Sequence, residues 1–277
     1  MKPLFYIFLF LSLAHSQRND IYSRPFQSGP EFDIDVQHYD IDLKILDHEK
    51  SFSGKTSITF NVIKPYLENI QFDVETFNVT KVKSEGKELS FEQKNGSLII
   101  QPDEPIRIGD ELTYTISYQS DGNIADPSKY GMRGAKVLGL GFFDESDDNP
   151  ALVQTHSFPE GARHWFPSND HPADKATSKI TTTVRSDWKV LANGVLTESE
   201  TNWKVLSNGM KIKSEDSGDS TRYVWELNLP NSTYLFVMVA GPFKVIKDYH
   251  RDIPMSYWVY PKDVNNADRS FNRTPEI

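Results

Sequence analysis

Apolar and polar residues alternate with a period of two along much of this chain, and this pattern limits most strongly what the chain can fold into. Between residues 38 and 45 the apolar side chains are Tyr39, Ile41, Leu43 and Ile45, and polar residues separate them. Side chains of a strand point alternately to opposite faces of a sheet, so this spacing predicts a half-buried β-strand. No segment of about 12 or more residues shows a convincing helical period.

The same alternation predicts strands over residues 58–62, 112–118, 180–184, 223–229 and 256–260. A continuous apolar run, Tyr234–Ala240, predicts a strand that is buried on both faces. The aromatic residues of these strands could form a platform for sugar rings, but at a period of two they are more often part of a core.

Turn signals separate these runs. They are Asn95-Gly96, Asp121-Gly122, Asn193-Gly194 and Asn208-Gly209, whose residues tolerate the backbone of tight turns. The last predicts a hairpin that joins residues 203–206 to 210–212. Many short strands joined by turns indicate an all-β fold, with antiparallel sheets arranged as a sandwich or barrel-like assembly and little helix.

The chain has 277 residues, enough for one large or two small domains, and 38% of them are hydrophobic, enough for a packed core. The net charge of -9 argues against nucleic acid as a partner, because phosphate binding needs a basic face. The absence of cysteine excludes disulfides, thiolate metal sites and a cysteine nucleophile.

The N-terminus has the pattern of an export signal. A lysine at position 2 precedes the apolar run Leu4–Leu13, and small residues follow at Ala14 and Ser16. The run is too short to span a bilayer, which needs about 20 apolar residues. We therefore expect a signal peptide over residues 1–16, cleaved near Ser16, then an extended leader over residues 17–36 and a β-domain over residues 37–277.

An export signal does not by itself specify the compartment in which the chain ends. An exported chain without cysteine suits a bacterial envelope better than a eukaryotic secretory route, and the product could be periplasmic, surface-attached or secreted. The Asn-x-Ser/Thr sequons at Asn78, Asn95 and Asn231 matter only in a eukaryote.

The long segment from Gly122 to Asn149 is the least regular part of the chain. It holds four glycines, at positions 131, 134, 139 and 141, and the acidic run Asp144–Asp148. A loop of this length is usually functional or mobile. The acidic run lacks the spaced ligands of a calcium loop, so a solvated face is favoured over a calcium site.

Catalytic motifs are missing from this sequence. His48-Glu49 begins a His-Glu-x-x-His zinc motif, but Phe52 stands where the second histidine is needed. His164 and His171 share one loop without a third ligand nearby, so no metal site is predicted there. No Gly-x-Ser-x-Gly elbow and no glycine-rich phosphate loop occur. Glycoside hydrolysis stays open, because the separation of paired carboxylates is a three-dimensional quantity.

One segment, Gly161–Ala176, combines fixed backbone with large rings. Pro167 and Pro172 restrict the backbone, and Arg163 is spaced to pair with Asp170. Two adjacent aromatic residues, Trp165 and Phe166, could anchor the segment in a core or against another domain. These features favour a structural corner over a catalytic site.

Taken together with five other segments in the same order, this corner resembles the N-terminal domain of the aminopeptidase N-like zinc metallopeptidases. The similar segments are residues 38–43, 52–60, 162–176, 190–194, 232–243 and 271–276. The resemblance covers residues 36–277 and implies a saddle-like β-domain that packs on a thermolysin-like zinc domain. In this comparison Val190–Gly194 matches an Asn-Gly hairpin of the family.

The family also places a substrate contact just before the corner. There a Gln or Glu binds the N-terminal amine of the peptide, and the resemblance puts Gln154 at that position, with His156 two residues further on. Counting back from Arg163 instead puts Phe158 there. The resemblance therefore implies Gln154, and next to it His156, as substrate-binding residues, and it implies no catalytic or metal-binding residue in this chain.

The last residues favour a domain that continues. Thr274-Pro275-Glu276 is a helix-start signal, and the resemblance places it where the zinc domain begins. We expect a non-catalytic N-terminal portion of an exported zinc aminopeptidase, whose zinc and catalytic residues lie in a domain absent from this chain. The alternative is a free-standing, exported β-sandwich module that binds peptide or carbohydrate.

Overall fold

Strands make up most of the protein in the computed structural model, which describes residues 32–120, 125, 137–201, 203–205, 211–213 and 220–276. The predicted all-β fold is confirmed. The predicted signal peptide, most of the leader and the turns at Asp121-Gly122 and Asn208-Gly209 lie outside the described residues. Within the described residues, no helix is both long and apolar enough to cross a bilayer.

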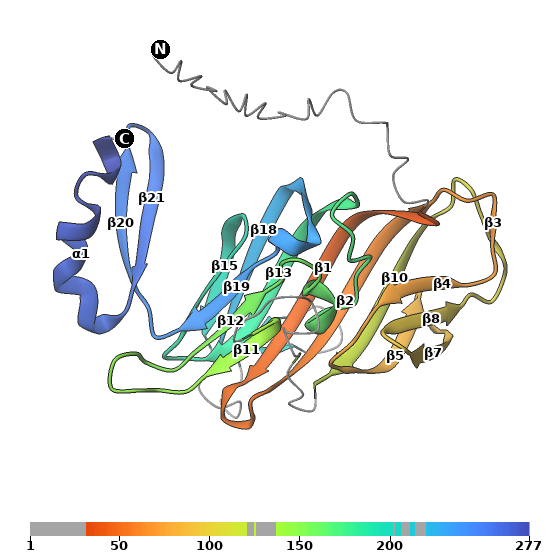
Figure 1. Ribbon diagram of the computed structural model, residues 1–277, viewed down its shortest axis with the longest axis horizontal. Helices are drawn as coiled ribbons and strands as arrows, with labels where there is room; N and C mark the ends of the chain where they lie inside the picture. Colours follow the sequence, from red (N-terminus) through yellow and green to blue (C-terminus); the bar gives the residue numbers. More distant parts are fainter. Residues whose placement is uncertain are drawn as a thin grey trace, which may run out of the picture. The chain divides into compact units, whose positions relative to one another are not determined.

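The largest sheet has eight strands (Figure 1). In spatial order they are β15 (Val195–Thr201), β18 (Ser220–Ser232), β13 (Lys175–Arg185), β1 (Ile34–Leu46), β2 (Ser51–Val62), β10 (Glu111–Gln119), β5 (Asn78–Ser84) and β6 (Lys87–Glu88). The strands predicted at residues 38–45, 58–62, 112–118, 180–184 and 223–229 all lie in this sheet.

Strand β1 begins earlier than the alternation indicated. A bulge between Val36 and His38 changes which face the side chains occupy, so Ile34 and Val36 are buried on even positions and Tyr39 on an odd one. A pattern search that assumes strict alternation stops at such a bulge. The expected leader over residues 17–36 is therefore wrong at its end, because residues 34–36 already belong to the strand.

One pairing in the large sheet departs from the predicted antiparallel arrangement. β1 and β13 run parallel, with Ile41 opposite Ile180, while every other pair that the described strands form is antiparallel. Alternation fixes which residues face the core but not the direction of the neighbouring strand, so the sequence pattern could not show this.

Five smaller sheets accompany the large one among the described residues. A four-stranded sheet has the order β11 (Gly139–Phe143), β12 (Leu152–His156), β19 (Met238–Gly241) and β14 (Lys189–Ala192). A three-stranded sheet has the order β4 (Ile70–Asp73), β8 (Ser97–Gln101) and β7 (Ser90–Lys94). Three pairs complete the set: β3 (Tyr66–Leu67) with β9 (Ile106–Arg107), β16 (Trp203–Val205) with β17 (Lys211–Lys213), and β20 (Lys244–His250) with β21 (Ile253–Val259).

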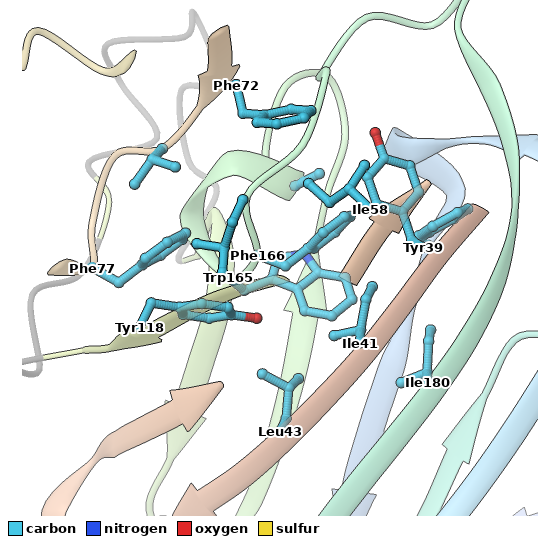
Figure 2. Packing of buried hydrophobic residues seen from close by; sticks show 14 of the residues in the cluster. Tyr39, Ile41, Leu43, Ile58, Phe72, Phe77, Tyr118, Trp165, Phe166 and Ile180 are labelled. Carbon is cyan, nitrogen blue, oxygen red and sulfur yellow. The ribbon is translucent and has the colours of Figure 1, made fainter. Parts of the chain in front are cut away.

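The core lies between these sheets and is rich in aromatic rings. Figure 2 shows Trp165 and Phe166 among Ile41 and Leu43 of β1 and Tyr118 of β10. All of these side chains are at most 2% exposed. Edge-to-face contacts join Tyr39 to Phe166, with ring centroids 5.3 Å apart, and Phe60 to Tyr114, at 5.2 Å. The high aromatic content thus fills the interior, as the core interpretation of the strand aromatics requires.

The predicted strand over Tyr234–Ala240 is wrong. The structure has a 3₁₀ helix, η4 (Thr233–Leu235), followed by the short strand β19, and Leu235 and Val237 are 43% and 42% exposed. Polar contacts account for the break. The Asn193 amide nitrogen donates to the Leu235 carbonyl at 3.1 Å, and the Val237 backbone nitrogen donates to the Asn193 amide oxygen at 2.6 Å. A side chain thus occupies the hydrogen bonds that a neighbouring strand would take.

The Asn-Gly signals have two different outcomes. Asn95-Gly96 closes the hairpin of β7 and β8 with φ of 50° and 79°, as predicted. Asn193-Gly194 does not form a hairpin, because β14 pairs with β19 and β15 pairs with β18. The chain crosses there from one sheet to another. Gly194 has a φ of 93°, and a Cβ atom would lie 2.0 Å from the Glu226 carbonyl oxygen, so the crossing passes directly against β18.

The hairpin predicted around Asn208-Gly209 is confirmed in its strands, since Lys204 of β16 pairs with Ile212 of β17. Part of the segment from Gly122 to Asn149 is regular after all, because Gly139–Phe143 forms β11. Near the C-terminus, the β20–β21 hairpin is followed by η5 (Pro261–Asp263), α1 (Val264–Phe271) and η6 (Thr274–Glu276). Two further 3₁₀ helices among the described residues are η1 (Asp47–Glu49) and η3 (Ala162–His164).

Candidate functional site

Strand β12 presents both predicted substrate-binding residues on one face. Val153 and Thr155 are 1% and 8% exposed and point into the core, so Gln154 and His156 face the opposite way and are half-buried. In register, Gln154 lies opposite Gly141 of β11 and Val239 of β19. The neighbouring strands therefore hold the backbone of Gln154 from both sides, and its side chain lies on the outward face.

A cavity of about 530 Å³ opens at this face. Gln154 lines it together with Leu152 and Val239, and the C-terminal hairpin and helix α1 supply the opposite wall. The wall residues that carry rings or polar groups are Phe243, Trp258, Tyr260, Asp263, Asn266, Ser270 and Phe271. A volume of this size lies within the range of sites that bind small ligands.

The aromatic rings of the cavity wall are ordered by stacking. Phe243 stacks on Tyr260 with centroids 5.7 Å apart and planes 11° apart, and Trp258 lies edge-on to Phe243 at 6.3 Å. Burial and the nearby Asp263 carboxylate raise the pKa of Tyr260, so its hydroxyl stays protonated at neutral pH. The wall is thus mainly apolar, with a carboxylate and amides at separate points.

His156 does not line this cavity. It ends β12, opposite Gly139, and its Nε2 atom is buried without a hydrogen-bond partner among the described residues. Phe158, the residue that counting back from Arg163 selects, is 58% exposed, and its ring contacts Tyr234 with centroids 6.0 Å apart. Of the three residues considered for the substrate amine, Gln154 is the one whose side chain reaches the cavity.

The corner Gly161–Ala176 is organised around Arg163. Its backbone nitrogen and Nε both donate to Asp170 Oδ2, at 3.2 and 3.3 Å, and Nη2 donates to the Asp170 carbonyl at 3.4 Å. Nη1 lies 3.4 Å from an oxygen of Asp73 in β4, and Nη2 lies 3.7 Å from Glu160. One guanidinium therefore joins the corner to the three-stranded sheet.

Other contacts tie the corner to the large sheet. The Thr233 hydroxyl donates to Asp170 Oδ1 at 2.7 Å, and the Ser232 hydroxyl donates to the Pro172 carbonyl at 2.7 Å. At the other end, Asp174 accepts hydrogen bonds from the Val36 backbone at 3.2 Å and from Asn169 at 2.6 Å. The corner thus holds β1, β18 and η4 together.

The ring residues of the corner are fully enclosed. Trp165 and Phe166 are 0% exposed, and Phe166 stacks on Phe236 with centroids 5.9 Å apart. The Trp165 indole donates to the Ser157 hydroxyl at 3.1 Å, and that hydroxyl donates to the Phe236 carbonyl at 2.8 Å. Pro167 is buried and Pro172 is exposed. These rings are out of reach of a ligand that approaches from solvent.

Burial controls how the corner titrates. It raises the pKa of Asp170 and Asp73 despite the neighbouring Arg163, and it raises the pKa of Asp174 to about 6. Burial also lowers the pKa of His164 to about 4, so this histidine is neutral at physiological pH.

Comparison with known proteins assigns the chain to a family. The family model of the peptidase M1 N-terminal domain matches residues 35–235, well over half of the chain. The chain belongs to this family. Beyond residue 235, the matched range leaves out β19, the β20–β21 hairpin and α1.

Relatives agree with this assignment. The chain is 25% identical over 215 residues to probable aminopeptidase 1 of Sulfurisphaera tokodaii, covering 78% of this chain and 22% of that protein. It is 24% identical over 260 residues to human (Homo sapiens) glutamyl aminopeptidase, covering 90% and 25%. The chain thus spans about a quarter of the length of the curated relatives it matches.

Solved structures show the same fold. An M1 zinc metallopeptidase from Deinococcus radiodurans superposes with a TM-score of 0.63 at 24% identity, over 81% of this chain and 46% of that one. The fold of the M1 N-terminal domain is therefore shared by these proteins at low sequence identity.

The described residues of this M1 N-terminal domain contain no group of three or more His, Cys, Asp or Glu side chains that could hold a metal ion. His164 is buried 4.0 Å from Glu75, whereas the His171 ring accepts a hydrogen bond from Ala173 and contacts Phe32. In the acidic run, Asp144 pairs with Lys50 at 2.7 Å. The candidate metal sites weighed from the sequence are thus not brought together among these residues.

Sequence reasoning missed most of the cavity wall. The pattern of residues 256–260 predicts an aromatic strand whose rings, among them Trp258 and Tyr260, belong to the core, and no motif marks Asp263, Asn266 or Phe271. The signal that could have found them is the aromatic enrichment of residues 257–260 next to the polar sequence Asp263–Asn266. That signal is weak, because a half-buried aromatic strand has the same pattern.

Proposed function

We propose that this chain is the N-terminal, non-catalytic portion of an exported zinc metalloaminopeptidase, an enzyme that removes N-terminal residues from peptides. Membership of the M1 N-terminal family and aminopeptidase relatives about four times longer support the proposal. The chain supplies one wall of the substrate cleft and packs on a catalytic domain, and export follows from the N-terminal signal pattern.

The described residues of this chain do not fit a zinc site. The sequence has no His-Glu-x-x-His motif, and the described residues offer no suitable ligand group. We therefore assign zinc, and the activated water it supplies when bound, to a domain outside these 277 residues.

The observation that carries the substrate role is the position of Gln154. Its amide faces a cavity whose opposite wall bears the Asp263 carboxylate, and none of the described residues that line this cavity is cationic. An amide oxygen and a carboxylate both attract a protonated N-terminal amine, and the apolar wall accepts an uncharged side chain. Gln154 thus positions the substrate, while the corner residues brace the domain.

The proposal is tested first on the gene. The coding sequence beyond codon 277 should encode Gly-x-Met-Glu-Asn and His-Glu-x-x-His, whereas a stop codon would favour the free-standing binding module. The 277-residue chain alone should not hydrolyse an aminoacyl anilide, and turnover by the purified chain would refute the assignment of catalysis to another domain.

Gln154 is tested in the extended enzyme. Gln154→Ala should raise KM for an aminoacyl anilide about tenfold, the effect expected when a ground-state contact worth about 1.4 kcal/mol is lost. Gln71→Ala, an exposed glutamine on β4, is the matched control. An unchanged KM in Gln154→Ala would remove this residue from the substrate site.

The aromatic wall of the cavity beside Gln154 supports the alternative function, a free-standing binding module. Stacked rings beside amide groups also suit an apolar peptide or a sugar, so a free-standing exported module remains the second candidate. Saturable binding of an oligosaccharide to the 277-residue chain, together with a stop codon after Ile277, would favour that module over the enzyme.

A further inference from the structure

Two of the sequons lie on exposed edges of the sheets. Asn78 is exposed at the start of β5, whose outer side pairs with β6 only at Lys83 and Ser84. Asn95 is exposed in the tight turn that joins β7 to β8, and β7 is the outermost strand of its sheet. Both asparagine side chains can thus accept a bulky group without displacing the core.

The residues that complete these two sequons are also near the surface. Thr80 is exposed, and its hydroxyl donates to the Ser117 carbonyl at 3.1 Å. Ser97 is partly exposed, and its hydroxyl accepts a hydrogen bond from Gln71 at 2.9 Å. Neither contact belongs to the core, so both sequons remain accessible after folding.

The third sequon has the opposite environment. Asn231 is half-buried in β18, and Ser232 and Thr233 are 4% and 1% exposed. Both hydroxyls hold the corner, through Pro172 and Asp170. A glycan on Asn231 would stand next to these two hydroxyls and keep the corner from closing, so a chain that carries one should not fold and be secreted. A fourth Asn-x-Thr sequence, Asn272–Thr274, runs directly into Pro275, which restricts the backbone of Thr274, and is not among the expected acceptors.

We propose that the exported chain carries N-linked glycans at Asn78 and Asn95 and none at Asn231. The donor is an oligosaccharide linked to a polyisoprenyl diphosphate. The amide nitrogen of asparagine forms a bond to the anomeric carbon and loses one proton, while the bond from that carbon to the diphosphate breaks and the lipid diphosphate leaves. The inference rests on the export part of the proposed function and takes the eukaryotic secretory route, the route in which the sequons matter, rather than the bacterial envelope that the lack of cysteine favours.

The two sites share a physical consequence. Unpaired edge strands promote association between sheets of different molecules, and a bulky polar group at an edge blocks such pairing. Both acceptors lie at the edges formed by β5 and β7, on the side of the molecule opposite the β20–β21 hairpin (Figure 1). Glycans at these positions cover the edges and leave the cavity beside Gln154 open.

Expression of the full 277-residue chain in eukaryotic cells tests the proposal. The secreted protein is treated with peptide N-glycosidase in ¹⁸O-labelled water, which converts each glycosylated asparagine to a labelled aspartate, and peptide mass spectrometry locates the label. We expect label at Asn78 and Asn95 and none at Asn231. Asn78→Gln and Asn95→Gln should each remove one mobility step on a gel, and Asn231→Gln should remove none.

Each other result counts against the proposal. A secreted chain without label overturns the glycosylation inference but leaves export intact. A chain that stays in the cytosol overturns export and this inference together. Label at Asn231 in the folded, secreted chain contradicts the argument that the corner closes that sequon.

Discussion

The corner Gly161–Ala176 and the cavity beside Gln154 differ in how their side chains are used. In the corner, Trp165 and Phe166 are fully buried, and Arg163 contacts three carboxylates. At the cavity, Gln154 and Trp258 are half-buried and border open space. The segment with the most recognisable sequence thus holds the fold together, whereas most of the wall of the cavity, the better candidate for ligand contact, carries no sequence motif.

Removing one aromatic ring from the corner and one from the cavity wall should show the difference in stability between the two regions most clearly. Trp165→Ala should lower the free energy of unfolding by about 4 kcal/mol, because it leaves a large cavity and removes the hydrogen bond to Ser157. Trp258→Ala, at the cavity wall, should cost clearly less, since its side chain already borders solvent. Urea unfolding monitored by circular dichroism measures the free energy of unfolding of both variants. Equal losses in the two variants would show that the regions do not differ in their contribution to stability.

Removing Arg163 should have the next largest effect. Arg163→Ala leaves the buried Asp170 carboxylate without its cation, and should lower the free energy of unfolding by about 3 kcal/mol. Lys94→Ala is the control, since its ion pair with Glu92 is exposed on both sides and should contribute at most about 1 kcal/mol. An extended enzyme with Arg163→Ala that kept its melting temperature but lost turnover would show that the corner takes part in catalysis.

The buried carboxyl of Asp174 should make the corner sensitive to pH. Its pKa is raised from 3.8 to about 6, so the folded chain holds this proton more tightly than the unfolded chain. The resulting stability is present below about pH 4 and is lost as the pH rises through about 6, with a maximum change of about 3 kcal/mol. The free energy of unfolding of the wild type relative to Asp174→Asn should fall over this range in urea titrations, and parallel pH profiles would contradict it.

The smallest effect on stability is expected at Gln154. Gln154→Ala removes a half-buried side chain that borders the cavity, and should change the free energy of unfolding by about 0.5 kcal/mol or less. The same variant should weaken binding of a peptide amine at the cavity, measured by titration calorimetry with leucine amide. N-acetyl-leucine amide, which lacks the charged amine, is the matched control ligand. A large loss of stability in Gln154→Ala would show that Gln154 is a structural residue, like those of the corner.

Much of the fold could be predicted because alternation reports burial directly. Tyr39, Ile41 and Leu43 are fully buried, as their spacing indicated, and Asn95-Gly96 forms its turn because both residues tolerate positive φ. The pairing of Arg163 with Asp170 was also anticipated from residue types and spacing. These features depend on neighbours that are close in sequence.

The rest depends on partners far away along the chain. Tyr234–Ala240 has the composition of a buried strand, but Asn193 takes its hydrogen bonds and turns part of it outward. The cavity combines β12 with residues about 100 positions later, so no local pattern marks Asp263 as a neighbour of Gln154. The role of Gln154 in substrate binding stays a prediction, because the position of a side chain does not show what binds there.

The parallel pairing of β1 with β13 sets the order in which the protein can assemble during synthesis. Ile41 meets Ile180, so about two-thirds of the chain must emerge before β1 gains this neighbour, whereas β2 follows β1 at once. Contacts between such distant residues slow folding, because a long loop has to close first. Until then one side of β1 in the nascent chain is open to chaperones, and the corner, which lies between the two strands in sequence, has no completed sheet to dock on.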